Sequence, residues 1–229
     1  MNTLARVAFF KDLPDLDFEK FDRRCIWKKV EPEASVVDYE DLTSDVFFIV
    51  TGSVRVLIRT AAGKEVILAE MQAGQYFGEL AAIDGVGRSA NVTALTRAEL
   101  CLVPGAIFRE IIFASPAATD KLLRLLSGRV RELNARLAEH AIFDLKHRLY
   151  AEILRMSVPR SGHALERIVS PPPFHHVIAA RIGCRREQVT REFSHMVGEG
   201  LASKTRGGLV ILRPDILQER LDEAMRNDG

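Results

Sequence analysis

Residues 77–92, with the sequence FGELAAIDGVGRSANV, place one acidic and one basic side chain nine positions apart among small and apolar residues. The guanidinium of Arg88 is a planar donor that can bind a phosphate through two parallel hydrogen bonds. The carboxylate of Glu79 offers only acceptors, which suits a sugar hydroxyl. Small neighbours would let a ligand approach the backbone closely. The remaining candidate contacts are Gly78, Leu80, Ser89 and Ala90.

The run Leu80–Ile83 predicts a short helical turn whose N-terminal amides would face an anion. Together these residues predict a site for a ligand that carries both a phosphate and a sugar. Both charged side chains are expected to be buried. The alternative interpretation is a surface loop with an incidental ion pair, and the strands expected on either side favour the binding site.

Short strand patterns separated by glycines fill the region from Ile26 to Val103. Val46–Val50 is a continuous apolar run, as expected of a strand covered on both faces. Gly52 interrupts it, and residues 61–64 predict a turn. The expected strands are Val46–Val50, Ser53–Ile58, Glu65–Ala69, Val92–Leu95 and Ala98–Val103. Because no long helix intervenes, the pattern predicts a β-sandwich or β-barrel.

The segment before these strands, residues 1–24, predicts helical turns and loop. Its apolar side chains are expected to cover one end of the β domain. They are Leu13, Leu16, Phe18 and Phe21.

A long helix is expected from Ser115-Pro116 to about His140, because Ser is a good N-cap and Pro suits the first helical position. Its apolar residues are 3, 4, 3 and 4 positions apart, which is typical of helices that pair along their length. They are Leu123, Leu126, Val130, Leu133 and Leu137. The alternative is one amphipathic helix packed on its own β domain.

Three further segments beyond this helix have recognisable sequence patterns. Residues 141–157 predict a further helix, with a candidate hinge at His140–Asp144. Residues 157–173 contain Ser, Gly and four prolines and predict a loop. Residues 214–229 predict a short amphipathic helix.

Residues 174–201 have the spacing of a helix-turn-helix. The small Ala179 lets two helices cross closely, Gly183 supports the turn, and Val189 anchors the second helix on the core. Residues 201–204 and 209–212 predict a β-hairpin wing behind it. Other packed helix pairs with a glycine turn share this spacing. The prediction of DNA binding therefore depends on the residue types in the second helix.

That second helix begins with Arg186, Glu187 and, further on, Arg191. Arg can bind guanine O6 and N7 together, and Glu can accept from the cytosine amino group. The alternative is a solvated charged face. The set predicts contact with double-stranded DNA at a half-site containing G·C pairs, and neighbouring residues complete the candidate DNA-binding set. They are Arg185 and Gln188 beside that set, and Lys204 and Arg206 on the wing.

The charge of the chain is uneven although its formal net value is only +1. Residues 140–213 carry 12 basic and 6 acidic side chains, which favours a polyanionic partner.

No apolar run approaches the ~18 residues needed to span a membrane, and the N-terminus lacks a secretory core, so a cytoplasmic protein is expected. The six histidines and three cysteines have no catalytic or metal-ligand spacing, so neither an enzyme nor a metal site is expected.

Two motifs resemble those of one known family. FGELA followed by RSA, in residues 77–90, resembles the phosphate-binding cassette of cyclic nucleotide-binding domains. GCRREQVTR, residues 183–191, resembles the recognition motif of the CRP/FNR transcription regulators. Because both motifs stand in the family's order, the resemblance covers nearly the whole chain.

The resemblance implies an α+β fold in three parts. Residues 1–114 would form a jelly-roll β-roll that encloses a cyclic nucleotide, residues 115–140 a dimerisation helix, and residues 141–229 a winged helix-turn-helix. Glu79 would bind the ribose 2′-hydroxyl and Arg88 the cyclic phosphate.

The family pattern also assigns roles on the long helix. Arg129 matches a position near the nucleotide. Leu133 and Asn134 stand where relatives that bind cyclic AMP have two hydroxyl residues that recognise adenine. Asn can bond either purine, so the choice between cyclic AMP and cyclic GMP stays open, and Ser89 does not settle it.

The resemblance further implies a homodimer on a palindrome with TGTGA-like half-sites, and RNA polymerase as an expected partner. No cofactor is expected besides the allosteric cyclic nucleotide. Two alternatives remain: a DNA-binding relative that responds to another signal or to none, and a cyclic-nucleotide-binding regulatory protein without a DNA role.

Three residues depart from the family pattern. Arg185 stands where a helix-capping Ser is common, and Arg cannot cap in that way. Glu192 replaces a usual aliphatic core residue. His175 replaces a usual basic contact, which predicts a weaker or pH-dependent contact there.

Overall fold

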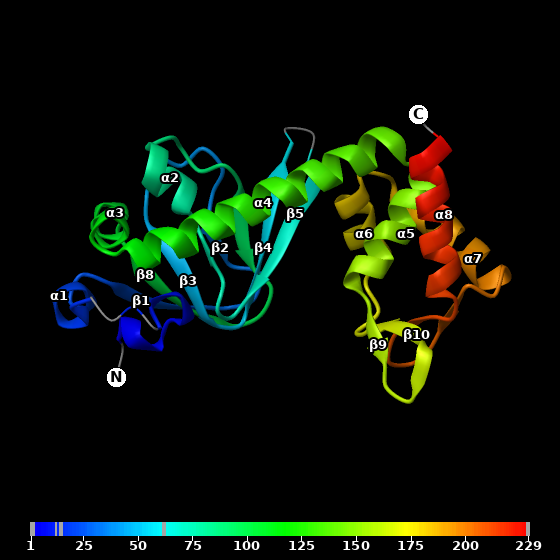
Figure 1. The fold of residues 1–229 in the computed structure, drawn as a ribbon, viewed down its shortest axis with the longest axis horizontal. Coiled ribbons are helices and arrows are strands. Elements are labelled where there is room, and N and C mark those ends of the chain that lie inside the picture. The colour runs from blue at the N-terminus through cyan, green and yellow to red at the C-terminus, as the bar shows by residue number, and fades with distance from the viewer. Residues whose placement is uncertain (1–2, 12, 14–15, 61–62, 228–229) are drawn as a thin grey trace. The chain divides into compact units, whose positions relative to one another are not determined.

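The computed structural model describes residues 3–11, 13, 16–60 and 63–227. The chain forms two compact units, Met1–Arg129 and Val130–Gly229, and each is described by itself (Figure 1).

The first unit contains two antiparallel four-stranded sheets, and its fold is a jelly-roll β-roll. One sheet has the order β1 (Ile26–Val30), β8 (Ala98–Val103), β3 (Val46–Thr51), β6 (Tyr76–Phe77). The other has the order β2 (Ser35–Val37), β7 (Asn91–Ala94), β4 (Ser53–Arg59), β5 (Glu65–Gln72). The five predicted strands are therefore confirmed. The predicted turn at residues 61–64 falls partly outside the described residues, and its Gly63 has a φ of +75°.

Strand β3 is apolar throughout because both of its faces are covered. Phe47 and Ile49 belong to the core that includes Val54, Val92 and other residues of the second sheet. Phe48 belongs to the core formed with the helical segments. The alternation follows from the two-residue period of a strand.

The helical segments before the strands are η1 (Leu4–Arg6), η2 (Ala8–Phe10) and α1 (Phe18–Asp22). The prediction that this region covers the β domain is confirmed. Leu13, Leu16 and Phe21 are buried and Phe18 is half-buried against the same core. Helix α3 (Gly105–Ala114), which joins this core through Ile107 and Phe108, was not predicted.

Helix α4 spans Pro116–Ile142, close to the predicted bounds. Its start is capped, since Ser115 Oγ accepts a hydrogen bond from the Ala118 amide at 3.3 Å. Its first turns pack on the β domain through the buried Ala118 and Leu122 and the half-buried Leu125 and Leu126. Of the predicted seam, Leu126 is half-buried, and the other four side chains are 55–70% exposed. These four are Leu123, Val130, Leu133 and Leu137.

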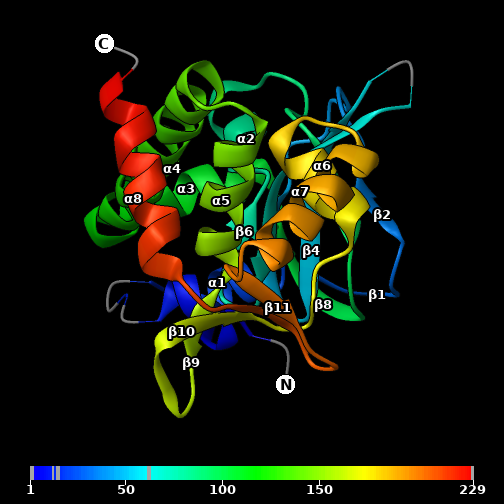
Figure 2. The same ribbon diagram turned by 90° about the vertical axis from the view of Figure 1, so that its right-hand side faces the viewer.

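The second unit contains helices around a four-stranded sheet of order β11-β12-β10-β9. Helix α8 lies beside α5, and its Leu217 and Leu221 join the core of this unit (Figure 2). The predicted C-terminal helix is thus part of the domain. The elements are α5 (Leu145–Met156), β9 (Val158–Arg160), β10 (His163–Val169), α6 (His175–Ile182), α7 (Arg186–Gly198), β11 (Ala202–Lys204), β12 (Leu209–Ile211) and α8 (Pro214–Asn227).

The predicted loop over residues 157–173 is wrong. Strands β9 and β10 form a hairpin there, and β10 continues into the sheet by pairing with β12. Most of the hairpin is exposed or half-buried, so its sequence lacks the apolar alternation that identifies a strand. Its pairing comes from a strand about 40 residues further along the chain, which local patterns do not reveal.

The helix-turn-helix is confirmed. Helices α6 and α7 are joined through Gly183, which has a φ of +73° and ends α6 in the left-handed conformation. Ala179 and Val189 are buried where the two helices meet. Strands β11 and β12 form the predicted wing.

The helix predicted over residues 141–157 is α5, and it begins later than expected, at Leu145. Phe143 and Asp144 separate it from α4, and Asp144 Oδ1 accepts a hydrogen bond from the His147 amide at 2.9 Å. The helices therefore break at the predicted junction.

Gly52→Ala should destabilise the β-roll more than Gly63→Ala. Both residues have positive φ, so a methyl group strains the backbone by about 1–2 kcal/mol at either position. Only at Gly52 would the new Cβ also meet the Arg97 carbonyl and, at 2.7 Å, the Ala98 Cα; at Gly63 nothing in the described chain lies within 4 Å. Urea unfolding should therefore show at least twice the loss for Gly52→Ala, and equal losses would contradict this packing.

Candidate functional site

The turn after β6 is α2, Glu79–Asp84, as predicted, and it begins at Gly78. Gly78 has a φ of +86°, a conformation that favours glycine. A Cβ there would also lie 2.7 Å from Arg88 Nη1 and from the Asp45 carbonyl oxygen. Glycine is therefore required at this position to bring the cassette backbone against Arg88.

Arg88 is buried, with 3% of its surface exposed. Its Nε donates to Thr43 Oγ1 at 3.0 Å and its Nη1 to the Gly78 carbonyl at 3.2 Å. The guanidinium also lies over the Phe47 ring, 5.4 Å from its centroid. Its Nη2 is buried and has no hydrogen-bond partner among the described residues. Burial lowers the pKa of Arg88, while Asp45 and Asp41 act in the opposite direction.

Glu79 is buried even more completely, with 1% exposed. Its Oε1 accepts from Arg129 Nη1 on α4, and Arg129 Nη2 donates to the Tyr76 carbonyl at 2.9 Å. The other oxygen, Oε2, is buried and has no partner among the described residues. Burial raises the pKa of Glu79, and Arg129 and then Arg88 act against that rise.

The predicted burial of both charges is confirmed, but they do not pair with each other in the described chain; Glu79 pairs with Arg129 instead. The cassette thus holds one buried acceptor atom and one buried donor atom that have no partner in the described part of the chain. Buried polar atoms are nearly always hydrogen-bonded, so two orphans of opposite character in one cassette indicate a ligand with both kinds of group.

The other predicted contacts surround this pair or extend along α4. Ala90 is buried, while Ser89 and Leu80 are exposed. Leu133 and Asn134 are exposed on α4, about one turn beyond Arg129. The sequence did not reveal Thr43 and Phe47, because their contacts with Arg88 join residues more than 40 positions apart.

The predicted DNA-binding residues lie at the start of α7 and on the wing. Arg185, Arg186, Glu187 and Arg191 are exposed, and Gln188 is half-buried. The Arg185 guanidinium has no acceptor atom. The side chain of Gln188 instead caps the start of α7, since its Oε1 accepts a hydrogen bond from the Arg185 amide at 3.0 Å.

On the wing, Lys204 ends β11 and Arg206 lies in the turn, and both side chains are exposed. The charged side chains in the first turns of α7 are likewise free to meet a partner. Glu192, in place of a usual core residue, is half-buried beside the buried Phe193.

His175, at the start of α6, is held against α7. Its Nδ1 lies 2.7 Å from Thr190 Oγ1, and its ring stacks on Phe193 at 5.0 Å between centroids. Burial lowers the pKa of His175, and the cations Lys204 and Arg186 lower it further. Thr190 Oγ1 donates to the Arg186 carbonyl at 3.1 Å, so the neutral ring donates its one hydrogen from Nδ1 to Thr190 and keeps a lone pair on Nε2. Only the protonated ring, below that pKa, can therefore offer a phosphate a charge and a hydrogen bond from Nε2.

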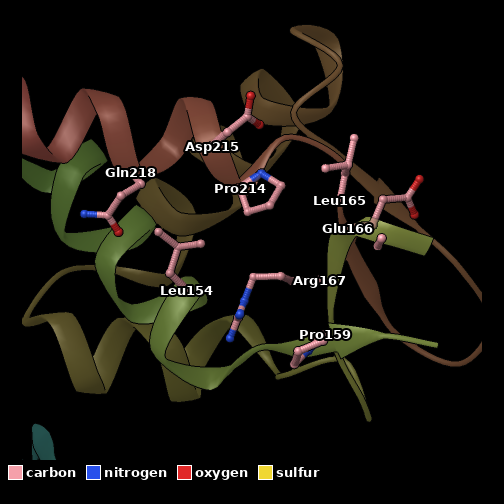
Figure 3. A pocket seen from close by; sticks show the side chains of 9 residues that line it. Leu154, Pro159, Leu165, Glu166, Arg167, Pro214, Asp215 and Gln218 are labelled. Atoms are coloured by element: carbon pink, nitrogen blue, oxygen red, sulfur yellow. The ribbon is translucent and has the colours of Figure 1, made fainter. Parts of the chain in front are cut away.

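A cavity of about 470 Å³ in the second unit lies elsewhere, among α5, the β9–β10 hairpin and the start of α8 (Figure 3). None of the predicted site residues lines it. Its polar groups are held by neighbours; Arg167, for example, donates to the side chain and the carbonyl of Ser157. It therefore offers no argument for a ligand.

Within the described ranges, no group of three or more His, Cys, Asp and Glu side chains is placed to hold a metal ion. The same part of the chain contains no helix that is long and apolar enough to cross a membrane.

Comparison with protein families matches residues 27–115 to the cyclic nucleotide-binding domain and residues 122–220 to the Crp-like helix-turn-helix domain. The cAMP-activated global transcriptional regulator CRP of Salmonella typhimurium is 26% identical over 194 residues, covering 84% of this chain and 92% of that protein. The Cyclic AMP receptor protein of Thermus thermophilus is 27% identical over 210 residues, covering 90% of each. A CooA variant from Carboxydothermus hydrogenoformans has a similar fold, with a TM-score of 0.78 and 16% identity over 93% of this chain and 95% of that one.

The chain is therefore a DNA-binding transcription regulator with a cyclic nucleotide-binding domain. It belongs to the CRP/FNR family.

Arg129→Met should destabilise the first unit by about 3 kcal/mol at neutral pH, because it leaves the Glu79 carboxylate buried without a cation. The loss should shrink as the pH falls, since burial raises the pKa of Glu79 and a protonated carboxyl group needs no cation. Urea unfolding between pH 7.5 and 5 measures both effects. Adding Glu79→Gln should recover most of the loss; strictly additive losses that do not change with pH would contradict the ion pair.

Proposed function

We propose that this chain is a homodimeric, sequence-specific transcription regulator whose DNA binding responds to cyclic AMP, with cyclic GMP as a second candidate ligand. The observation that carries the proposal is the pair of buried, unpartnered atoms in the cassette, Glu79 Oε2 and Arg88 Nη2. A cyclic nucleotide has a matching group for each: the ribose 2′-hydroxyl donates to Glu79, and the ring phosphate accepts from Arg88.

The remaining ligand contacts follow from the same geometry. Gly78, Leu80, Ser89 and Ala90 frame the two charges. Arg129 holds Glu79 Oε1 and leaves Oε2 available, so a ligand hydroxyl can bind without breaking the ion pair. Leu133 and Asn134 on α4 are proposed to face the base. The two relatives reported above are named for cyclic AMP, which favours that ligand, while Asn134 can bond either purine.

The exposed face of α4 supports a homodimer. Four of its five apolar seam residues are more than half exposed in the single chain, and their spacing is that of a two-stranded coiled coil. We propose residues 1–114 as the ligand domain, 115–140 as the dimerisation helix and 141–229 as the DNA-binding domain. Two-fold symmetry would place two α7 helices on a palindrome with TGTGA-like half-sites.

Base contacts are proposed for Arg186, Glu187 and Arg191, and backbone contacts for the neighbouring residues and the wing. These neighbours are His175, Arg185, Gln188, Lys204 and Arg206. The protein would act by binding and not by catalysis, in the cytoplasm with the chromosome. RNA polymerase as a further partner is inferred from the family alone.

Arg88→Ala should weaken binding of the preferred cyclic nucleotide by at least about tenfold, because it removes charge-assisted hydrogen bonds to the phosphate. Arg88→Lys should lie between Arg88→Ala and wild type, since it keeps the charge and loses the planar fork. Arg97→Ala is a matched control on the surface of the same unit, where Arg97 pairs with the exposed Glu31.

Isothermal titration with cyclic AMP and cyclic GMP measures these affinities. Equal affinities of wild type and Arg88→Ala would refute the cassette assignment. If neither nucleotide binds the wild type, the chain is a CRP/FNR regulator that responds to another signal.

Glu187→Ala should relax base choice at one position of each half-site, because a carboxylate accepting from a cytosine amino group discriminates by about 1–3 kcal/mol. Selection of binding sites from random DNA measures the change. Lys204→Ala serves as the comparison, since loss of a phosphate contact should weaken all sequences alike. An unchanged selected motif for Glu187→Ala would show that Glu187 reads no base.

A further inference from the structure

The last turn of α4 carries a histidine, His140, that is linked to two other helices of the second unit through one nitrogen atom of Arg148. His140 Nδ1 lies 3.0 Å from Arg148 Nη1 on α5. The same Nη1 donates to the carbonyl of Ile182, the last residue of α6, at 3.1 Å. Because Nη1 has two hydrogens, it can serve both acceptors. One guanidinium nitrogen therefore joins the ends of α4 and α6.

The chemistry of the two partners fixes the position of the proton on His140. A guanidinium only donates, so Nδ1 must offer its lone pair and the ring must be neutral, with its hydrogen on Nε2. Protonation would place a hydrogen on Nδ1 and set two donors, both positively charged, against each other. The His140 side chain is exposed, so it exchanges protons with the solvent.

The surrounding charges favour the neutral ring. The groups that face it are Arg136 and Glu139 on α4, Arg148, Glu152 and Arg155 on α5, and Arg181 on α6. Both carboxylates are already engaged: Glu139 accepts from Arg155, and the buried Glu152 accepts from Arg155 and Arg181.

Partial desolvation of the ring lowers the pKa of His140, the cations Arg148 and Arg136 lower it further, and Glu139 opposes them. The folded state therefore binds this proton less readily than the unfolded chain. The contact is present at neutral pH and is lost as the pH falls through the lowered pKa.

Arg148 also stabilises the turn that precedes the recognition helix. The last carbonyls of a helix lack partners within it, and a cation placed there compensates both the lost hydrogen bonds and the helix dipole. The His140 ring packs close by, since a Cβ on Gly183 would lie 3.5 Å from its Cε1. Arg148 Nε is buried without a partner among the described residues, so the placement of this guanidinium depends on its two Nη1 contacts.

We propose that His140, Arg148 and the Ile182 carbonyl form a proton-operated tether, which holds the last turn of α4 on the helix-turn-helix turn when His140 is neutral and releases it when His140 is protonated. His140 and Arg148 are then positioning residues for DNA binding. The tether rests on the second unit alone and does not depend on which signal the first unit senses.

Two substitutions separate the states of the tether. His140→Asn keeps an acceptor near the position of Nδ1 but cannot take up a proton. His140→Lys places a permanent cation there. Hydrogen exchange of the amides in residues 182–185 of the full-length protein reports whether the turn is held, and comparison at a single pH cancels the intrinsic pH dependence of exchange.

At pH 7.5 wild type and His140→Asn should exchange alike, while His140→Lys should exchange about tenfold faster, the factor expected for one lost charge-assisted hydrogen bond. At about pH 5.5 or below, wild type should approach His140→Lys, and His140→Asn should stay slow. If all three proteins exchange alike at both pH values, there is no tether.

Two further readouts distinguish a tether from general loosening of the fold. The ¹⁵N signals of His140 should report the Nε2–H tautomer at neutral pH and a titration midpoint that rises in Arg148→Met. An Nδ1–H tautomer would overturn the proposal. Between pH 7.5 and 5.5, DNA affinity should fall several-fold more for wild type than for His140→Asn. The reason is that the released helix-turn-helix turn must become ordered again when DNA binds. All three readouts can be made without nucleotide.

Discussion

A carboxylate and a guanidinium are both buried in the cassette of the first unit, and each would destabilise the fold by several kcal/mol if left alone. Arg88 is compensated locally, by Thr43, a backbone carbonyl and the face of Phe47. Glu79 is compensated by Arg129, which belongs to α4. The need to neutralise one buried carboxylate thus attaches the long helix to the ligand cassette. Among the described residues, Glu79 Oε2 and Arg88 Nη2 still have no hydrogen-bond partner.

Helix α4 contributes residues to both of the contacts on which this account depends. It is continuous from Pro116 to Ile142 and carries both Arg129, which holds Glu79, and His140, which contacts Arg148. The two residues are eleven positions apart, about 16 Å along the helix. The proposed ligand would bind beside the first contact, and the proposed tether involves the second. Such a ligand can change DNA binding only through its different affinities for two arrangements of this helix and its partner.

The sequence predicted what local chemistry determines. Short apolar runs separated by glycines identified the strands, and Ser115-Pro116 identified the start of α4. Gly78 and Gly183 helped to identify the cassette turn and the helix-turn-helix. Contacts between segments far apart in the chain could not be predicted from the sequence. Arg129 lies 50 positions from Glu79, and nothing in either neighbourhood marks them as partners. The β9–β10 hairpin was missed because a partner strand, and not its own composition, makes it extended. Residue types indicated two buried charges for one ligand, but not the protein partners that tertiary packing gives each of them, Arg129 for Glu79 and Thr43 for Arg88.

The most direct test of this account is the coupling between the two sites. The affinity of the full-length protein for a TGTGA-containing palindrome should be measured by fluorescence anisotropy with and without saturating cyclic AMP and cyclic GMP, and nucleotide affinity should be measured with and without that DNA. We expect one nucleotide to raise DNA affinity by at least about fivefold, and the DNA to raise the affinity for that nucleotide by the same factor, as linkage requires. A nucleotide that binds in the cassette and leaves DNA affinity unchanged would contradict the account.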